Sequence, residues 1–211
     1  MADARHLAAL VATARALGAD RAAPLPAAAV VVDERVRLKC RVPLCASHGR
    51  NLMCPPYAPS PDETRAVLRR YADALVVQQD IAVTQADVDA VFGGEGYAER
   101  RAREAEGAAA PGGCEAQVVA AQNAFARLMT ALETEAFKMG YRFAAAFAGG
   151  ECVLCEVCKG VDDGVCRHPF EARPSMEAVG IDVVATARAA GLDVELPAVT
   201  RPSWTGLLLV D

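Results

Sequence analysis

The organisation of this chain is decided by the stretch Gly149-Gly150-Glu151-Cys152-Val153-Leu154-Cys155-Glu156-Val157-Cys158, which continues to Cys166-Arg167-His168-Pro169. Three cysteines recur at every third position, and a fourth follows after a short loop. Thiolates at this spacing on a tightly turning backbone can all face one centre, as in many iron–sulfur proteins. We therefore predict an iron–sulfur cluster here, in preference to a zinc ion, with these ligands: Cys152, Cys155, Cys158 and Cys166.

A second group of cysteines lies far earlier in the chain: Cys40, Cys45 and Cys54, the last followed by Pro55-Pro56. In bacterial ferredoxin runs the last cysteine also precedes a proline, and it ligates the other cluster of a pair. Two partitions are therefore open. Either Cys40, Cys45 and Cys54 form one site beside the four later cysteines, or Cys54 and Cys166 are exchanged between the sites.

Seven cysteines do not complete two four-thiolate sites. One site then takes a non-cysteine ligand, for which His48 and His168 are the candidates by position, or it leaves a coordination position open. An iron with an open position is a Lewis acid that can bind a substrate. In the simpler alternative, the first three cysteines bind a structural zinc or pack as small apolar side chains.

Other residues near these cysteines are weaker candidates. Glu177 and Asp182 are possible acid–base groups, although helix capping explains both. Cys114 does not lie at a ligand-like sequence spacing from any other cysteine and is predicted not to be a ligand. Cations flank both cysteine groups, where they would stabilise an anionic cluster, bind an anionic ligand or simply face solvent: Arg37, Lys39, Arg41, Lys159, Arg167, His168 and Arg173.

Composition limits the class of protein. The 211 residues suit a single metal-binding domain over residues 1–211, and 53% hydrophobic residues are enough for a core without cross-links. A net charge of -5 argues against sequence-independent nucleic-acid binding. The sequence contains no apolar run of membrane-spanning length and no secretory pattern near residue 1. Eight cysteines in such a chain predict a reducing, cytoplasmic location.

Periodicity and capping signals predict an α/β (or α+β) domain with a single sheet flanked by helices and two cysteine-rich loops. We expect a flexible excursion at about residues 84–113, where charges of both signs alternate with glycines. Helices are expected at 3–17, 61–71 and 115–139 and after Asp182. Strands are expected at 27–32, 36–38, 74–78, 142–148 and 204–210.

Four motifs together resemble a known family. They are Cys40-x4-Cys45-x8-Cys54-Pro55-Pro56, Gly150-x-Cys152-x2-Cys155-x2-Cys158, Cys166-Arg167-His168-Pro169 and Arg173-Pro174-Ser175-Met176-Glu177-Ala178-x-Gly180-Ile181-Asp182-Val183. Their residues and spacing are similar to those of the predicted metal-binding proteins named domain of unknown function 2284. The resemblance runs from about residue 27 to the C-terminus. It implies metal binding at the seven motif cysteines and implies no reaction.

Three functional hypotheses follow. The first is an iron–sulfur protein with one or two [4Fe-4S] clusters that exchanges electrons with a partner protein. The second is an enzyme whose three-cysteine cluster binds and activates a small-molecule substrate at an open iron. The third is a zinc-stabilised binding module without a redox role.

Overall fold

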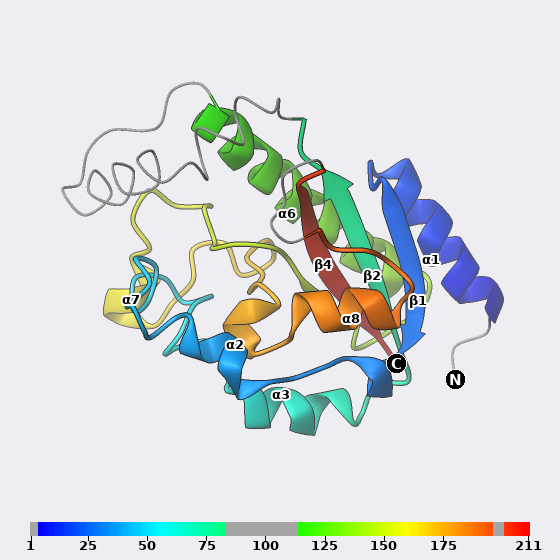
Figure 1. The fold of residues 1–211 in the computed structure, drawn as a ribbon, viewed down its shortest axis with the longest axis horizontal. Coiled ribbons are helices and arrows are strands. Elements are labelled where there is room, and N and C mark those ends of the chain that lie inside the picture. Colours follow the sequence, from blue (N-terminus) through cyan, green and yellow to red (C-terminus); the bar gives the residue numbers. More distant parts are fainter. Residues whose placement is uncertain (1–3, 83–113, 196–200) are drawn as a thin grey trace.

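The computed structural model describes residues 4–82, 114–195 and 201–211, so the excursion expected at 84–113 lies outside the described residues. Within them, four strands form one antiparallel sheet in the order β1-β2-β4-β3 (Figure 1). The strands are β1 (Arg21–Pro26), β2 (Asp73–Asp80), β3 (Ala145–Phe147) and β4 (Ser203–Val210). The prediction of a single sheet flanked by helices is confirmed.

Helices cover both faces of this sheet. The longest are α1 (Ala4–Ala16) and α6 (Cys114–Lys138), which pack on one face. The other face is covered by α3 (Pro61–Leu68), α8 (Val183–Ala189) and the 3-10 turn η2 (Glu177–Val179). Short elements complete the described part: α2 (Glu34–Leu38), α7 (Gly160–Asp163) and the 3-10 turn η1 (Ala27–Ala29).

The two central strands are buried on both sides, which explains their uninterrupted apolar sequence. Leu75 and Leu208 face the layer of α1 and α6, whereas Val76 and Leu207 face the layer of α3 and α8. All four side chains are fully buried. Because successive strand residues point to opposite faces, a strand between two helical layers needs apolar residues at every position.

Local capping signals predicted the helix starts correctly. At α3, the Ser60 side chain accepts from the backbone N–H of Glu63, while the Glu63 carboxylate accepts from the backbone N–H of Ser60. At α8, Asp182 accepts from the N–H of Ala185 at 2.9 Å. Both bonds satisfy donors that the first helical turn leaves unpaired. In the described residues no helix combines the length and apolar character needed to cross a bilayer.

Two expected strands are wrong. Residues 27–32 do not form a strand, because the chain instead pairs with β2 earlier, through β1. β1 can contain Pro24 and Pro26 because it is an edge strand and both prolines are exposed, so their missing N–H groups interrupt no hydrogen bonds between strands. Residues 36–38 belong to α2, which begins where the Asp33 side chain caps the N–H of Arg35.

The two cysteine-rich loops lie beside each other at one side of the molecule, away from α1 and β1 (Figure 1). Gly160 of the second loop packs directly against Leu52 of the first, and a Cβ at Gly160 would lie 2.5 Å from Leu52 Cδ1. Segments separated by about half the chain therefore meet in one region.

Candidate metal centres

The four later cysteines surround one small cavity. Cys152, Cys155, Cys158 and Cys166 all line a space of about 20 Å³, and each is partly buried. The segment Asn51–Met53 of the first loop forms part of its wall. Among the described residues that line this cavity, none is a carboxylate, while Lys159, Arg167 and His168 are cationic or can become so. Four thiols without a competing acid are a donor set for a thiolate-held metal centre.

Backbone N–H groups point at two of these sulfurs. The N–H of His168 donates to Cys166 Sγ at 3.3 Å, and the N–H of Leu154 donates to the sulfur of Cys152. Burial nevertheless raises the pKa of the Cys152 thiol, and the Leu154 bond opposes that effect. Because a metal binds the thiolate, N–H groups placed at the sulfurs favour the ligating form.

The three earlier cysteines line a separate, larger cavity. Cys40, Cys45 and Cys54 border a space of about 340 Å³, together with His48 and Glu177. Turn hydrogen bonds shape this loop, including Cys45 N–H to Cys40 O at 3.2 Å. Burial raises the pKa of Cys40, and it raises the pKa of Cys54 to about 11 against a hydrogen bond from Asn51.

Each candidate histidine lines a different cavity. His48 lies in the three-cysteine cavity, and His168 lies in the four-cysteine cavity. In the described residues no three histidine, cysteine, aspartate or glutamate side chains are arranged to hold a single metal ion. The structure therefore brings the cysteines around two cavities, grouped four and three, without converging them on one point.

Glu177 and Asp182 have different roles, although capping explained both in the sequence. Asp182 caps α8, as expected. Glu177 starts η2 without capping it and reaches the three-cysteine cavity. Its carboxylate lies deep in the molecule but is open to water through the cavities, and this depth raises its pKa.

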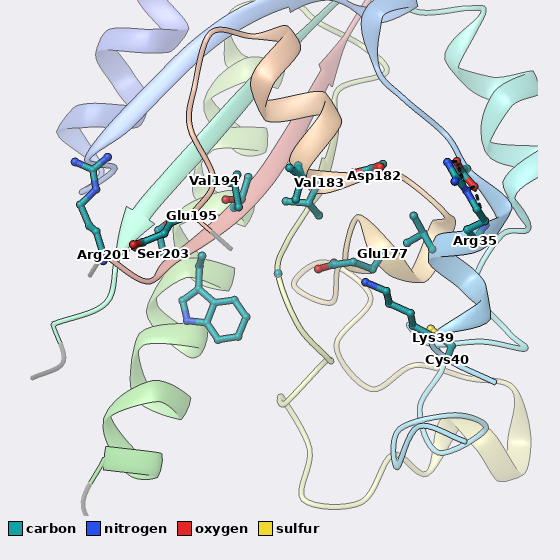
Figure 2. Close-up of a pocket in the computed structure, with 16 residues that line it drawn as sticks. Arg35, Lys39, Cys40, Glu177, Asp182, Val183, Val194, Glu195, Arg201 and Ser203 are labelled. Atoms are coloured by element: carbon teal, nitrogen blue, oxygen red, sulfur yellow. Dashed lines mark hydrogen bonds and ion pairs between the residues drawn. The ribbon is translucent and has the colours of Figure 1, made fainter. Parts of the chain in front are cut away.

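A third cavity adjoins the three-cysteine cavity. It has a volume of about 640 Å³ and shares Cys40 and Glu177 with its neighbour. Figure 2 shows Lys39 and Glu177 pointing into it, with Val194 and Ser203 on the opposite side. No single sequence motif spans this cavity, because its walls come from α2, η2, α8 and β4, although Glu177, Asp182 and Val183 belong to the motif at residues 173–183.

Comparison with known protein families identifies the family of this chain. The model for the family described as predicted metal-binding protein (DUF2284) matches residues 23–210. The chain belongs to this family. The match includes all seven motif cysteines and confirms the resemblance seen in the sequence. A search of the curated proteins and a search of the solved structures each returned no significant match.

Several cations of this DUF2284 protein form hydrogen bonds or ion pairs with residues of the fold. Arg37 donates to Pro59 O at 2.7 Å and to Ala178 O at 2.8 Å, which fastens the first loop. Arg173 forms an ion pair with Glu133 on α6, with side chains only 15% and 9% exposed. Arg167 pairs with Asp163 at 2.8 Å on the surface. The sequence could not distinguish the roles of Arg37 and Arg173, because their partners are distant along the chain, whereas Arg167 pairs with a residue only four positions away.

The Glu133–Arg173 pair is expected to position the second cysteine loop. Glu133→Ala should lower the free energy of unfolding by about 3 kcal/mol, because it leaves the Arg173 guanidinium buried without its partner. Urea denaturation measures this change. The control is Glu135→Ala, which removes an exposed pair with Lys138 and should cost about 0.5 kcal/mol or less. Equal losses in both variants would contradict the assigned role.

Proposed function

We propose that this DUF2284 protein is an iron–sulfur protein for electron transfer, with one [4Fe-4S] cluster on Cys152, Cys155, Cys158 and Cys166 and a second on Cys40, Cys45 and Cys54. One observation carries the proposal: the seven motif thiols are divided four and three between two adjacent cavities. When bound, such clusters supply one-electron transfer, and an iron without a thiolate supplies a Lewis-acid position.

The spacing of the thiols supports a cluster over a single zinc ion. Structural zinc sites usually combine two C-x2-C pairs that are well separated in sequence. Three cysteines at every third position, followed by a fourth after a short loop, are instead typical of [4Fe-4S] ligation.

The surroundings of the four-cysteine cavity suit an anionic centre. Lys159 and Arg167 line it, and two backbone N–H groups donate to its sulfurs. Positive charge and N–H donors both stabilise the thiolates and raise the reduction potential of the centre they hold. Leu52 and Met53 cover it on the side of the first loop. This partial cover by the first loop supports an electron-transfer role at the four-cysteine site.

A second candidate function is catalysis at the three-cysteine site, and the cavity there favours it. Three thiols leave one ligand position of a cluster unfilled, and the cysteines border a space of about 340 Å³. The groups that could fill the position or act on a bound substrate are His48 and Glu177. In this arrangement the four-cysteine site would relay electrons from a partner to the three-cysteine site.

The full chain purified without oxygen is expected to be brown, with absorbance near 400 nm and about four irons and four sulfides for each cluster. Iron, sulfide and zinc analysis of the same sample measures the content. A colourless protein with stoichiometric zinc would contradict both iron–sulfur hypotheses. Cyanide separates the two candidate functions, because an open iron should change its EPR spectrum on binding this ligand and two closed clusters should not.

A further inference from the structure

The cavity of about 640 Å³ beside Cys40 has the size of a small-molecule site, for which about 300–1,000 Å³ is usual. Much of its wall is apolar and comes from Val36, Val183, Val184, Val194 and Trp204. It adjoins the three-cysteine cavity, with which it shares the lining residues Cys40 and Glu177. A ligand held here would therefore lie next to the proposed three-cysteine centre.

Most charged groups around this cavity are already engaged within the described residues. Asp33 pairs with Arg35 at 2.5 Å, and Asp182 caps α8. Arg201 lies 3.9 Å from Asp80. These groups are therefore poor candidates for binding a charged ligand.

Lys39 and Glu177 differ from the other charges. In the described part of the chain neither is part of a close ion pair, and both charged ends point into the cavity (Figure 2). The Glu177 carboxylate accepts a hydrogen bond from Ser175, and the nearby Lys39 charge partly opposes the rise that burial causes in the Glu177 pKa. The two residues lie on one wall because α2 is fastened beside η2: Asp33 N–H donates to Gly180 O at 2.9 Å, and Arg37 donates to Ala178 O at 2.8 Å. Two groups that can carry opposite charges thus lie on the same wall, facing an apolar wall.

We propose that this cavity binds a small zwitterion with an apolar side chain, of the class of the aliphatic α-amino acids. The ligand carboxylate lies on the Lys39 ammonium, its ammonium lies on the Glu177 carboxylate, and its side chain packs on Val183, Val194 and Trp204. A ligand with only one charge leaves the opposite protein charge unpaired in the cavity, which costs binding energy. As the substrate class of the three-cysteine centre, this inference rests on the proposed function, although binding itself needs only the cavity.

Isothermal titration of the full chain, purified without oxygen, tests the proposal with four probes. L-leucine carries both charges and the side chain. 3-Methylbutylamine lacks the carboxylate, 4-methylpentanoate lacks the ammonium, and glycine lacks the side chain. Leucine is expected to bind at least about tenfold more tightly than each of the other three, since every deletion removes one of the proposed contacts. Equal affinity for leucine and either singly charged analogue would overturn the proposal.

Two variants test which protein side chain contacts the carboxylate of the ligand and which contacts its ammonium. Lys39→Met should weaken leucine and 4-methylpentanoate by about tenfold or more and leave 3-methylbutylamine unchanged. Glu177→Gln should weaken leucine and 3-methylbutylamine and leave 4-methylpentanoate unchanged. A general loss of folding would weaken all probes together, so this crossed pattern is specific to ligand contact. Arg41→Met is the control, because Arg41 is exposed in the same loop and does not line the cavity. Its leucine affinity should equal that of the wild type, and a crossed pattern absent from both variants would overturn the assignment.

Iron analysis of the titrated sample separates failure of this inference from failure of the proposed function. Leucine binding by a protein without iron supports the zwitterion site and rejects the iron–sulfur proposal. An iron-loaded protein that shows no preference for leucine rejects the zwitterion site and leaves the iron–sulfur proposal standing.

Discussion

Cys166→Ala is expected to remove one whole cluster, about four irons and four sulfides per chain, and leave the other in place. Cys166 lines the same cavity as Cys152, Cys155 and Cys158, and its sulfur accepts the N–H of His168. Loss of this thiolate leaves a cavity in which no carboxylate among the described lining residues can replace it. Anaerobic metal and sulfide analysis, with the EPR signal of each centre, measures the loss.

Cys54→Ala is the matched experiment at the other site. Cys54 is 8% exposed and borders the cavity of Cys40 and Cys45, so its removal should abolish the other cluster and its EPR signal. Cys114→Ala is the control and should keep both clusters, because Cys114 has no ligand spacing in the sequence. If Cys54→Ala and Cys166→Ala each abolished the signal assigned to the opposite site, the exchanged partition would be correct. If neither variant lost a cluster, the ligand assignment itself would be wrong.

Removal of the metal should open both cysteine loops while the sheet stays folded. We expect amide protection in residues 39–59 and 150–173 to fall on the order of 1,000-fold after anaerobic iron chelation, measured by hydrogen exchange of the full chain. These loops contain little regular structure, since the second holds only the single turn of α7 and the first is built from turn bonds. Metal–thiolate bonds would therefore supply most of their stability.

The strands β2 and β4 serve as the internal control for that experiment. Leu75, Val76, Leu207 and Leu208 are fully buried between two helical layers, and none of them lines either cysteine cavity. Their protection should change by less than about tenfold, because the sheet core does not include the loops. Loss of protection throughout β2 and β4 would show that the metal stabilises the whole fold. Unchanged protection in both cysteine loops would show that the metal does not stabilise the loops.

Structural elements whose sequence signals act over a short range were predicted correctly. The capping residues Ser60 and Asp182 fix the starts of α3 and α8 through bonds to N–H groups three positions away. The apolar runs of β2 and β4 and the long amphipathic pattern of α6 gave the correct element types. The edge strand β1 was missed, because Pro24 and Pro26 are acceptable only where an outer face of the sheet leaves their positions unpaired. That context depends on pairing with β2, about fifty residues away.

The sequence by itself determined which residues are the candidate ligands, and this assignment stays a prediction. Regular cysteine spacing is a local property of the chain, so it is visible without a fold. Only the tertiary structure shows that Cys54 borders the cavity of Cys40 and Cys45 and that Cys166 borders the other, because either cysteine is compatible in sequence with both sites. The same holds for the cavity of Lys39 and Glu177, which exists because hydrogen bonds from the Asp33 N–H to Gly180 O and from the Arg37 side chain to Ala178 O join segments more than one hundred residues apart.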